Sequence, residues 1–181
     1  ILVTGSEGYV GKRAVMHALE EGNRVRGFDR KSASMQCGNF EHFTGDITSL
    51  DQVRQAVTGV EAVFHCAAAL AQFVRDEATM TRVNVQGTAN VLQAALDAGV
   101  QKVVFLSSVE VYGIDVPVPC TEDQPLKPIC RYGHDKVECE KLCEDFQARG
   151  LDATVFRPPT VNGPGQNEPF LVEQMVATRE G

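Results

Sequence analysis

Short apolar runs alternate along this chain with longer stretches in which apolar residues recur three and four positions apart. The short runs predict buried strands at Ile1–Thr4, Arg24–Asp29, Ala62–Cys66, Lys102–Ser107 and Ala153–Arg157, with a weaker strand at Glu41–Thr44. The longer stretches predict helices at Tyr9–Glu21, Leu50–Val57, Asp76–Ala98 and Tyr132–Ala148. Four prolines between Pro117 and Pro128 exclude regular structure from that segment.

This alternation determines the fold class that we expect. Strands that are almost continuously apolar, each followed by a helix, are typical of a parallel sheet covered on both faces. Right-handed crossovers then give an α/β fold with a Rossmann-type doubly wound sheet. The chain shows no internal repeat and no low-complexity segment.

Composition narrows the class of protein. The chain has 181 residues, of which 43% are hydrophobic, and its net charge of −7 comes without any cluster of Lys or Arg, which argues against nucleic acid as a partner. No apolar run approaches the roughly 20 residues of a membrane span, and the sequence contains no basic n-region followed by an apolar h-region. The six cysteines form no CxxC pair and no zinc-ligand pattern with the four histidines, so we expect reduced thiols, no metal and a cytoplasmic location. Cys139 and Cys143 belong to an apolar stripe of their helix and are expected in the core.

A glycine-rich turn, ILVTGSEGYVGKRAV, follows the first strand and opens the first helix. In a doubly wound sheet this turn lies at the carboxyl edge of the strands, where a helix N-terminus offers unpaired N–H groups and a positive dipole end. Gly5 and Gly8 allow a pyrophosphate to approach the backbone, and Gly11 allows the helix to pack closely on the first strand. A tight turn without a ligand is the alternative, but the strand before it and the helix after it favour a dinucleotide site.

Asp29 ends the second strand, 18 residues after Gly11. A carboxylate at this place can accept hydrogen bonds from both ribose hydroxyls of an adenosine and repels a 2′-phosphate, which favours NAD over NADP. Arg30 is suited to a 2′-phosphate, so NADP stays open as the weaker alternative. An ordinary acid at a strand end is the other interpretation of Asp29.

The spacing TGxxGxxG resembles that of short-chain dehydrogenases/reductases, in particular the extended branch of NAD-dependent epimerases and dehydratases that modify nucleotide sugars. Further stretches resemble this family in order along nearly the whole chain: Asp46-Ile47 in FTGDITSL, His65-Cys66-Ala67-Ala68, Asn84 in NVQGT, FLSSVEVYG from Phe105, YGHDK from Tyr132, and RPPTVNGPG from Arg157. Two positions depart from the family pattern, since Asp135 stands where Ser is usual and Asn162 where Tyr is usual.

The resemblance implies a set of coenzyme-binding residues and a division of the chain. The implied set is Gly5, Gly8, Tyr9, Val10, Gly11, Asp29, Arg30, Asp46, Ile47, Cys66, Ala67, Ala68, Asn84, Ser107, Tyr132, Lys136, Pro158 and Val161. Residues 1–165 correspond to the NAD-binding domain with the catalytic groups, and residues 166–181 to the start of an incomplete C-terminal substrate-binding region. The missing initiator Met and the abrupt end of FLVEQMVATREG suggest a fragment. A homodimer through the helices at 76–98 and 132–148 is implied as well.

Tyr132 and Lys136 are four residues apart and share a helix face. A phenol ionises near pH 10, which is too high for a base at neutral pH, but an adjacent ammonium and the positive nicotinamide ring lower that pKa. Tyr132 is therefore expected as the general acid/base, with Lys136 lowering its pKa and hydrogen-bonding the nicotinamide ribose. Ser108 is expected to bind the reacting substrate oxygen. A chance Tyr–Lys pair on an exposed helix is the alternative.

Glu110 bears on the type of reaction. In nucleotide-sugar dehydratases this block looks like STDEVYG, whose Asp–Glu pair eliminates water, whereas Val109 here occupies the Asp position and argues against a 4,6-dehydratase. A nucleotide-sugar decarboxylase stays open, as does a solvent-facing Glu110 without a role. Ser107 and His65 are interpreted as supporting residues.

The leading hypothesis is an NAD-dependent nucleotide-sugar epimerase. Oxidation or reduction of a non-sugar alcohol or ketone is the second, although TEDQPLKP resembles a loop of the sugar-modifying branch. A non-catalytic NAD-sensing regulator is the third, but such proteins usually lose the Tyr/Lys pair.

Overall fold

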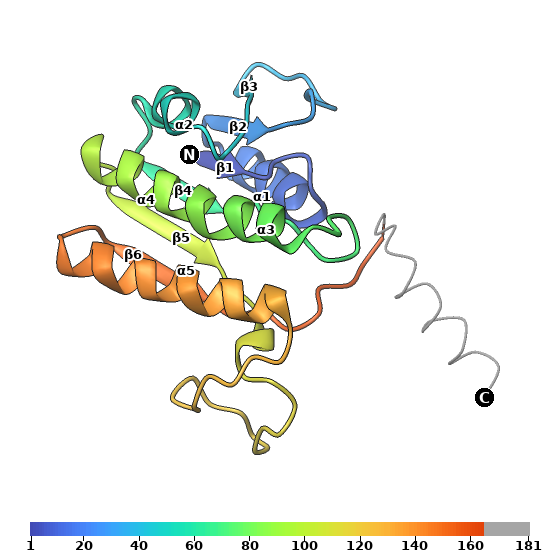
Figure 1. The fold of residues 1–181 in the computed structure, drawn as a ribbon. Helices are drawn as coiled ribbons and strands as arrows, with labels where there is room; N and C mark the ends of the chain where they lie inside the picture. Colours follow the sequence, from blue (N-terminus) through green and yellow to red (C-terminus); the bar gives the residue numbers. More distant parts are fainter. Residues whose placement is uncertain (165–181) are drawn as a thin grey trace.

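A single parallel sheet organises the computed structural model, which describes residues 1–164 (Figure 1). The strand order is β3-β2-β1-β4-β5-β6, so the sheet grows outward from β1 in both directions, as in the doubly wound fold that the sequence predicted. The strands are β1 (Leu2–Thr4), β2 (Val25–Asp29), β3 (Phe40–Thr44), β4 (Ala62–His65), β5 (Lys102–Leu106) and β6 (Ala153–Phe156).

Helices cover both faces of the sheet. They are α1 (Tyr9–Glu20), α2 (Leu50–Val57), α3 (Glu77–Thr81), the π-helical turn η1 (Arg82–Gln86), α4 (Gly87–Asp97), the 3-10 turn η2 (Val109–Val111) and α5 (Arg131–Ala148). Successive residues of a strand point to opposite faces. Leu2 accordingly joins the larger hydrophobic cluster beneath α2, α4 and α5, and Val3 joins a smaller cluster with Val15 of α1 (Figure 1).

The stretch from Asp76 to Ala98 is helical throughout, but it is not the uninterrupted α-helix that the sequence predicted. A π-helical turn at Arg82–Gln86 separates α3 from α4. The carbonyl of Asn84 accepts the Thr88 hydroxyl at 2.6 Å and the Cys139 thiol at 3.3 Å. Both side-chain donors supplement a backbone amide that this carbonyl also accepts, and apolar periodicity reveals neither contact.

The segment Pro117–Pro128 contains no helix or strand, as predicted, and forms a loop that projects below the sheet in Figure 1. The loop returns to the sheet edge where the Lys127 amide donates to the Val111 carbonyl at 2.9 Å. The predicted substrate-binding region at 166–181, like the end of the domain at Gly165, lies outside the described residues.

Cys139 and Cys143 are 1% and 0% exposed and belong to the larger hydrophobic cluster, as predicted. All six cysteines lie within the described part of the chain and are free thiols. Among residues 1–164, no group of His, Cys, Asp and Glu is arranged to hold a metal ion. No helix in that same range combines the length and apolarity needed to cross a membrane.

Candidate active site

The glycine turn is held by backbone contacts that leave no room for side chains. Gly5 has a φ of +70°, and its amide donates to the Phe28 carbonyl at 2.8 Å. A Cβ on Gly5 would lie 2.8 Å from the Cα of Ala67, and a Cβ on Gly11 would lie 2.0 Å from the Gly5 carbonyl oxygen. Gly11 therefore brings the helix against the turn itself, rather than against β1 as the sequence analysis inferred.

The N-terminus of α1 faces the same edge of the sheet. Gly8 is its N-cap, and within the described residues no side chain caps it. Tyr9 and Val10 begin the helix, so their amides belong to the first turn, which lacks intrahelical acceptors. This arrangement of unpaired amides at a positive dipole end is suited to an anion.

Asp29 lies at the end of β2, next to this turn. Its Oδ2 accepts the Glu7 amide at 3.0 Å and its Oδ1 accepts the Lys31 amide at 3.0 Å. These two hydrogen bonds fix the carboxylate at the rim of the sheet, where the sequence placed a ribose contact. Arg30, the neighbouring residue, is exposed.

Asp46 and Ile47 follow β3. Burial raises the pKa of Asp46, but hydrogen bonds from the Thr48 amide at 2.9 Å and hydroxyl at 2.8 Å, with the charge of Arg30, hold it below its usual range. Asp46 is therefore anionic at neutral pH. Ile47 is 5% exposed, and its side chain packs so closely on Gly87 that a Cβ there would lie 2.7 Å from Ile47 Cγ2.

The end of β4 is organised around a neutral histidine. His65 is 0% exposed, with Nδ1 2.7 Å from the Thr4 hydroxyl and Nε2 3.0 Å from the Thr88 hydroxyl. Burial, with the charge of Lys136, lowers the pKa of His65 to about 3, so it has the supporting role inferred from the sequence. Cys66 donates to the Thr4 carbonyl at 2.9 Å, and burial raises the pKa of its thiol to about 12.

Asn84 holds the loop that follows β4. Its Oδ1 accepts the Ala69 amide at 2.7 Å, and its Nδ2 donates to the Ala69 carbonyl at 3.1 Å and to Asp135 at 3.2 Å. This loop contains Ala67, which is half-buried, and Ala68, which is exposed. The structure thus gives Asn84 a positioning role, and its direct contact with a coenzyme stays a prediction.

The two serines after β5 point in different directions. Ser107 is 3% exposed and donates to the Glu140 carboxylate, which agrees with its interpretation as a supporting residue. Ser108 is half-buried and caps η2, where its hydroxyl oxygen accepts the Glu110 amide at 3.2 Å. Since that oxygen acts as an acceptor here, its proton is available to an oxygen of a bound molecule.

Tyr132 and Lys136 lie together at the start of α5, as the spacing predicted. The Lys136 Nζ is 5.5 Å from the centroid of the Tyr132 ring and 4.6 Å from that of Phe105, and it donates to the Leu106 carbonyl at 2.6 Å. Lys136 is 3% exposed, and burial lowers its pKa against the opposing effect of nearby cysteines and Glu140. The ammonium is thus fixed between the end of β5 and the phenol ring.

Sequence reasoning missed a buried ion pair behind this site. Arg157 binds Glu140 through Nε–Oε1 at 3.0 Å and Nη2–Oε2 at 2.7 Å, and its Nη1 donates to the Tyr112 hydroxyl at 2.6 Å and the Glu122 carbonyl at 2.9 Å. The bonds to Glu140 and the Tyr112 hydroxyl raise the pKa of Arg157 despite burial. With Ser107, this network joins β5, α5, β6 and the proline-rich loop. Local periodicity holds no signal for such a pairing.

The remaining predicted residues lie at the surface of the site. Glu110 is exposed and its Oε2 accepts the Cys130 thiol at 2.8 Å, while the Cys130 sulfur caps α5 by accepting the Gly133 amide at 3.3 Å. The Pro158 carbonyl accepts the Val109 amide at 3.1 Å. Val161 is 39% exposed, and its contact with a coenzyme stays a prediction, as does that of Pro158.

Known proteins with similar sequences include an epimerase and a dehydrogenase. The chain is 36% identical over 174 residues to the UDP-glucose 4-epimerase of Lactobacillus helveticus, covering 90% of this chain and 52% of that protein. It is 33% identical to the human sterol-4-alpha-carboxylate 3-dehydrogenase, decarboxylating, over 99% of this chain and 48% of that protein. The chain therefore spans about half the length of these relatives.

The fold is also similar to that of a protein whose crystal structure is known. A short-chain dehydrogenase/reductase superfamily protein from Agrobacterium tumefaciens, crystallised with bound NAD, superposes with a TM-score of 0.80 and 38% identity, covering 86% of this chain and 48% of that one. The family model for NAD-dependent epimerases/dehydratases matches residues 1–179. Sequence, fold and site geometry agree, and the chain belongs to the NAD-dependent epimerase/dehydratase family.

Proposed function

We propose that this chain forms the coenzyme-binding and catalytic part of an NAD-dependent nucleotide-sugar epimerase. The observation that carries the proposal is the position of Tyr132, Lys136 and Ser108 at the same sheet edge as the glycine turn. The similarity to a UDP-glucose 4-epimerase supports a nucleotide sugar as the substrate class.

The residues present fit NAD. Gly5 and Gly11 stand where any Cβ would collide with backbone, and the uncapped start of α1 suits a pyrophosphate. The fixed carboxylate of Asp29 suits a free ribose and disfavours a 2′-phosphate. The similar Agrobacterium protein binds NAD. When bound, NAD would accept a hydride from a sugar carbon and return it.

The protein's own groups would move the proton. Tyr132 would take the proton of the substrate hydroxyl on its phenolic oxygen and later give it back. The buried ammonium of Lys136, held by the Leu106 carbonyl, favours the phenolate. The Ser108 hydroxyl would donate to the same substrate oxygen as negative charge develops on it.

A second candidate function is oxidation of a non-sugar alcohol. The human sterol-4-alpha-carboxylate 3-dehydrogenase aligns with 99% of this chain at 33% identity, so this catalytic part is compatible with a sterol alcohol. In that reaction NADH would accumulate, whereas an epimerase regenerates NAD within each turnover. The two functions therefore differ in a signal that absorbance at the nicotinamide band measures directly.

A homodimer would use the groove beside the catalytic helix. This groove has a volume of about 1000 Å³ and lies between the α3–α4 helix and α5, lined by Thr81, Val85, Ala89, Arg131 and Leu142 among others. The groove is lined by both apolar and charged side chains, a composition that suits packing against the same helices of a second copy of the chain.

The substitution Tyr132→Phe in the full-length protein tests the function. We expect interconversion of UDP-glucose and UDP-galactose, followed by chromatography of the nucleotide sugars, to fall about 10²–10⁴-fold, because the general acid/base is removed. Calorimetric affinity for NAD⁺ should stay at the wild-type value. His134→Ala, an exposed position on the same helix, is the matched control and should leave both unchanged. Full activity of Y132F, or a wild-type protein that accumulates NADH with a sterol and ignores nucleotide sugars, contradicts the proposal.

A further inference from the structure

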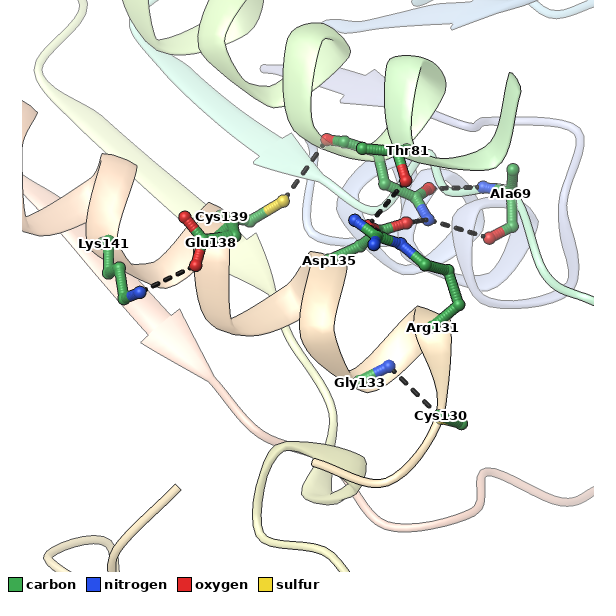
Figure 2. A network of polar contacts seen from close by, with 10 residues as sticks. Ala69, Thr81, Cys130, Arg131, Gly133, Asp135, Glu138, Cys139 and Lys141 are labelled. Carbon is green, nitrogen blue, oxygen red and sulfur yellow. Dashed lines mark hydrogen bonds and ion pairs between the residues drawn. The ribbon is translucent and has the colours of Figure 1, made fainter. Parts of the chain in front are cut away.

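Asp135, the residue that replaces the usual serine of the family pattern, is completely buried in α5. Its carboxylate is 0% exposed and lies among three donors (Figure 2). Oδ1 accepts the Thr81 hydroxyl at 2.9 Å and the Arg131 Nε and Nη2 at 2.9 and 2.8 Å. Oδ2 accepts Nδ2 of Asn84 at 3.2 Å. A buried carboxylate is stable only when its charge is compensated in this way.

The charge of Asp135 and the backbone of Ala69 favour the same orientation of the Asn84 amide. A carboxylate only accepts hydrogen bonds, so Asn84 must turn its NH₂ group toward Asp135 and its Oδ1 away. In this orientation Oδ1 accepts the Ala69 amide at 2.7 Å and Nδ2 donates to the Ala69 carbonyl at 3.1 Å. A flipped Asn84 would set a donor against the Ala69 amide and an acceptor against its carbonyl, and both bonds would be lost.

Ala69 belongs to the loop that contacts the glycine turn. The Cα of Ala67 lies 2.8 Å from the place of a Cβ on Gly5, so the two backbones touch. A displaced loop would therefore disturb the place where the pyrophosphate of NAD is expected. Asp135 itself is adjacent to Lys136 and lies within one helical turn of Tyr132.

We infer that Asp135 is a positioning residue that acts through the Asn84 amide and fixes the catalytic helix to the loop beneath the coenzyme. The guanidinium of Arg131 and the hydroxyl of Thr81 both donate to Oδ1 of Asp135. Oδ2 is therefore left to accept the NH₂ group of Asn84. The inference rests on the proposed function, because NAD⁺ affinity is its readout.

The isosteric substitution Asp135→Asn breaks this arrangement without changing its shape. An Asn side chain here has one oxygen, and both Arg131 and Asn84 need an acceptor. If the oxygen of the new Asn side chain faces Arg131, the NH₂ group of this side chain lies against the NH₂ group of Asn84. Two donors then face each other, and the Asn84 side chain is displaced from its hydrogen bonds to Ala69. We expect NAD⁺ affinity to fall about tenfold in calorimetry on the full-length protein, as for the loss of a hydrogen bond to a charged group. Asp145→Asn, exposed on the same helix, is the matched control and should bind NAD⁺ like wild type.

The double variant Arg131→Ala/Asp135→Asn separates positioning from a merely structural role. Without Arg131, the Asn side chain can direct its oxygen to Asn84 and its NH₂ group to the Thr81 hydroxyl, and NAD⁺ affinity should return to the wild-type value. A structural role predicts the opposite, because the double variant has lost more contacts than D135N.

The inference is overturned if D135N binds NAD⁺ like wild type or if the double variant binds more weakly than D135N. If D135N does not fold, the double variant alone tests the inference. Wild-type NAD⁺ affinity of the double variant supports it, and weakened affinity overturns it. Light scattering checks that each variant keeps the mass of the wild-type assembly, since Arg131 also lines the groove beside α5. A wild-type protein without NAD⁺ affinity would refute the proposed function instead, which keeps the two failures distinct.

Discussion

The two ends of the candidate site lie on one sheet edge but are built by opposite means. At the glycine turn, position is set by the absence of side chains, so that the helix backbone at Gly11 comes directly against the Gly5 carbonyl. At the start of α5, position is set by buried charges, with Asp135, Lys136 and Glu140 all less than 5% exposed. The coenzyme end therefore depends on close backbone packing, and the catalytic end on buried charges that are hydrogen-bonded or ion-paired.

The buried face of α5 contains both apolar residues and buried charges. Toward its C-terminal half the face is apolar, with Cys139, Cys143 and Phe146 in the larger hydrophobic cluster. Toward the sheet edge the same face carries the charged residues. Burying a charge costs free energy unless a partner compensates it, so each of these residues contacts another element of the fold. The catalytic helix is consequently held by several elements at once.

Breaking the charged end should have the largest effect on stability. Arg157→Ala would leave the buried Glu140 carboxylate without the guanidinium that binds it. We expect the free energy of unfolding of the full-length protein, measured in urea, to fall by about 3–5 kcal/mol, because an uncompensated buried charge remains. NAD⁺ affinity at low temperature should change little, since the ion pair does not touch the glycine turn.

Arg149→Ala is the matched control for this substitution. Arg149 is exposed, donates to the Gln93 side chain at 2.9 Å and lies 4.1 Å from the centroid of the Phe146 ring, so its removal should cost about 1 kcal/mol or less. Equal losses for the two arginines would show that the catalytic end does not depend on buried charge.

His65 is hydrogen-bonded to Thr4, which precedes the glycine turn, and to Thr88 of α4, and it gives the stability of this sheet edge a pH dependence. Burial lowers its pKa from 6.5 to about 3, so below pH 6.5 the unfolded chain takes up a proton that the folded protein refuses. Stability present above pH 6.5 should therefore be lost as the pH falls toward 3, at about 1.4 kcal/mol per pH unit.

The measurement is urea unfolding at several pH values for wild type and His65→Gln, in which this contribution is absent. Their difference isolates His65 from the carboxylates that also titrate in acid. The exposed His134→Gln should show the pH dependence of wild type. If the stability of wild type and of H65Q changed in parallel with pH, the pKa of His65 would not be lowered in the folded protein.

The same contrast explains what the sequence could predict. The glycine turn and Asp29 were identifiable because backbone packing requires glycine at fixed spacing, and spacing is visible in a sequence. The Tyr132/Lys136 pair followed from helical periodicity combined with the family resemblance. All six strands were predicted, the one at Glu41–Thr44 only weakly, and the parallel sheet followed from their alternation with helices.

What escaped prediction depends on contacts between distant residues. Asp135 and Glu140 are charged residues of a helix rich in charged residues, and the packing of α5 on the rest of the fold buries both. Their partners are Arg157, 17 positions away, and Asn84, 51 positions away. The π-helical turn at Arg82–Gln86 likewise escaped prediction, and its Asn84 carbonyl accepts the thiol of Cys139, 55 positions away in α5.

A substitution in the glycine turn should weaken NAD⁺ binding more than stability, the reverse of what we expect for Arg157→Ala. In Gly11→Ala the new methyl group would lie 2.0 Å from the Gly5 carbonyl oxygen, a distance that forces the turn and the start of α1 apart. Overpacking of this kind costs about 1–3 kcal/mol of stability, less than the loss of the buried ion pair. NAD⁺ affinity should nevertheless fall more than tenfold, about the change for one good hydrogen bond to a charged group, because the amides that would bind the pyrophosphate are displaced together.

Gly38→Ala is the control, since a Cβ at Gly38 has no neighbour within 4 Å, and it should change neither stability nor NAD⁺ affinity. Calorimetry and urea unfolding of G11A and R157A side by side then decide the comparison. If the two ends are built as the structure indicates, G11A loses coenzyme affinity out of proportion to stability and R157A loses stability out of proportion to affinity. Parallel losses in both variants would instead mean that the sheet edge behaves as one cooperative unit, in which backbone packing and buried charge cannot be separated.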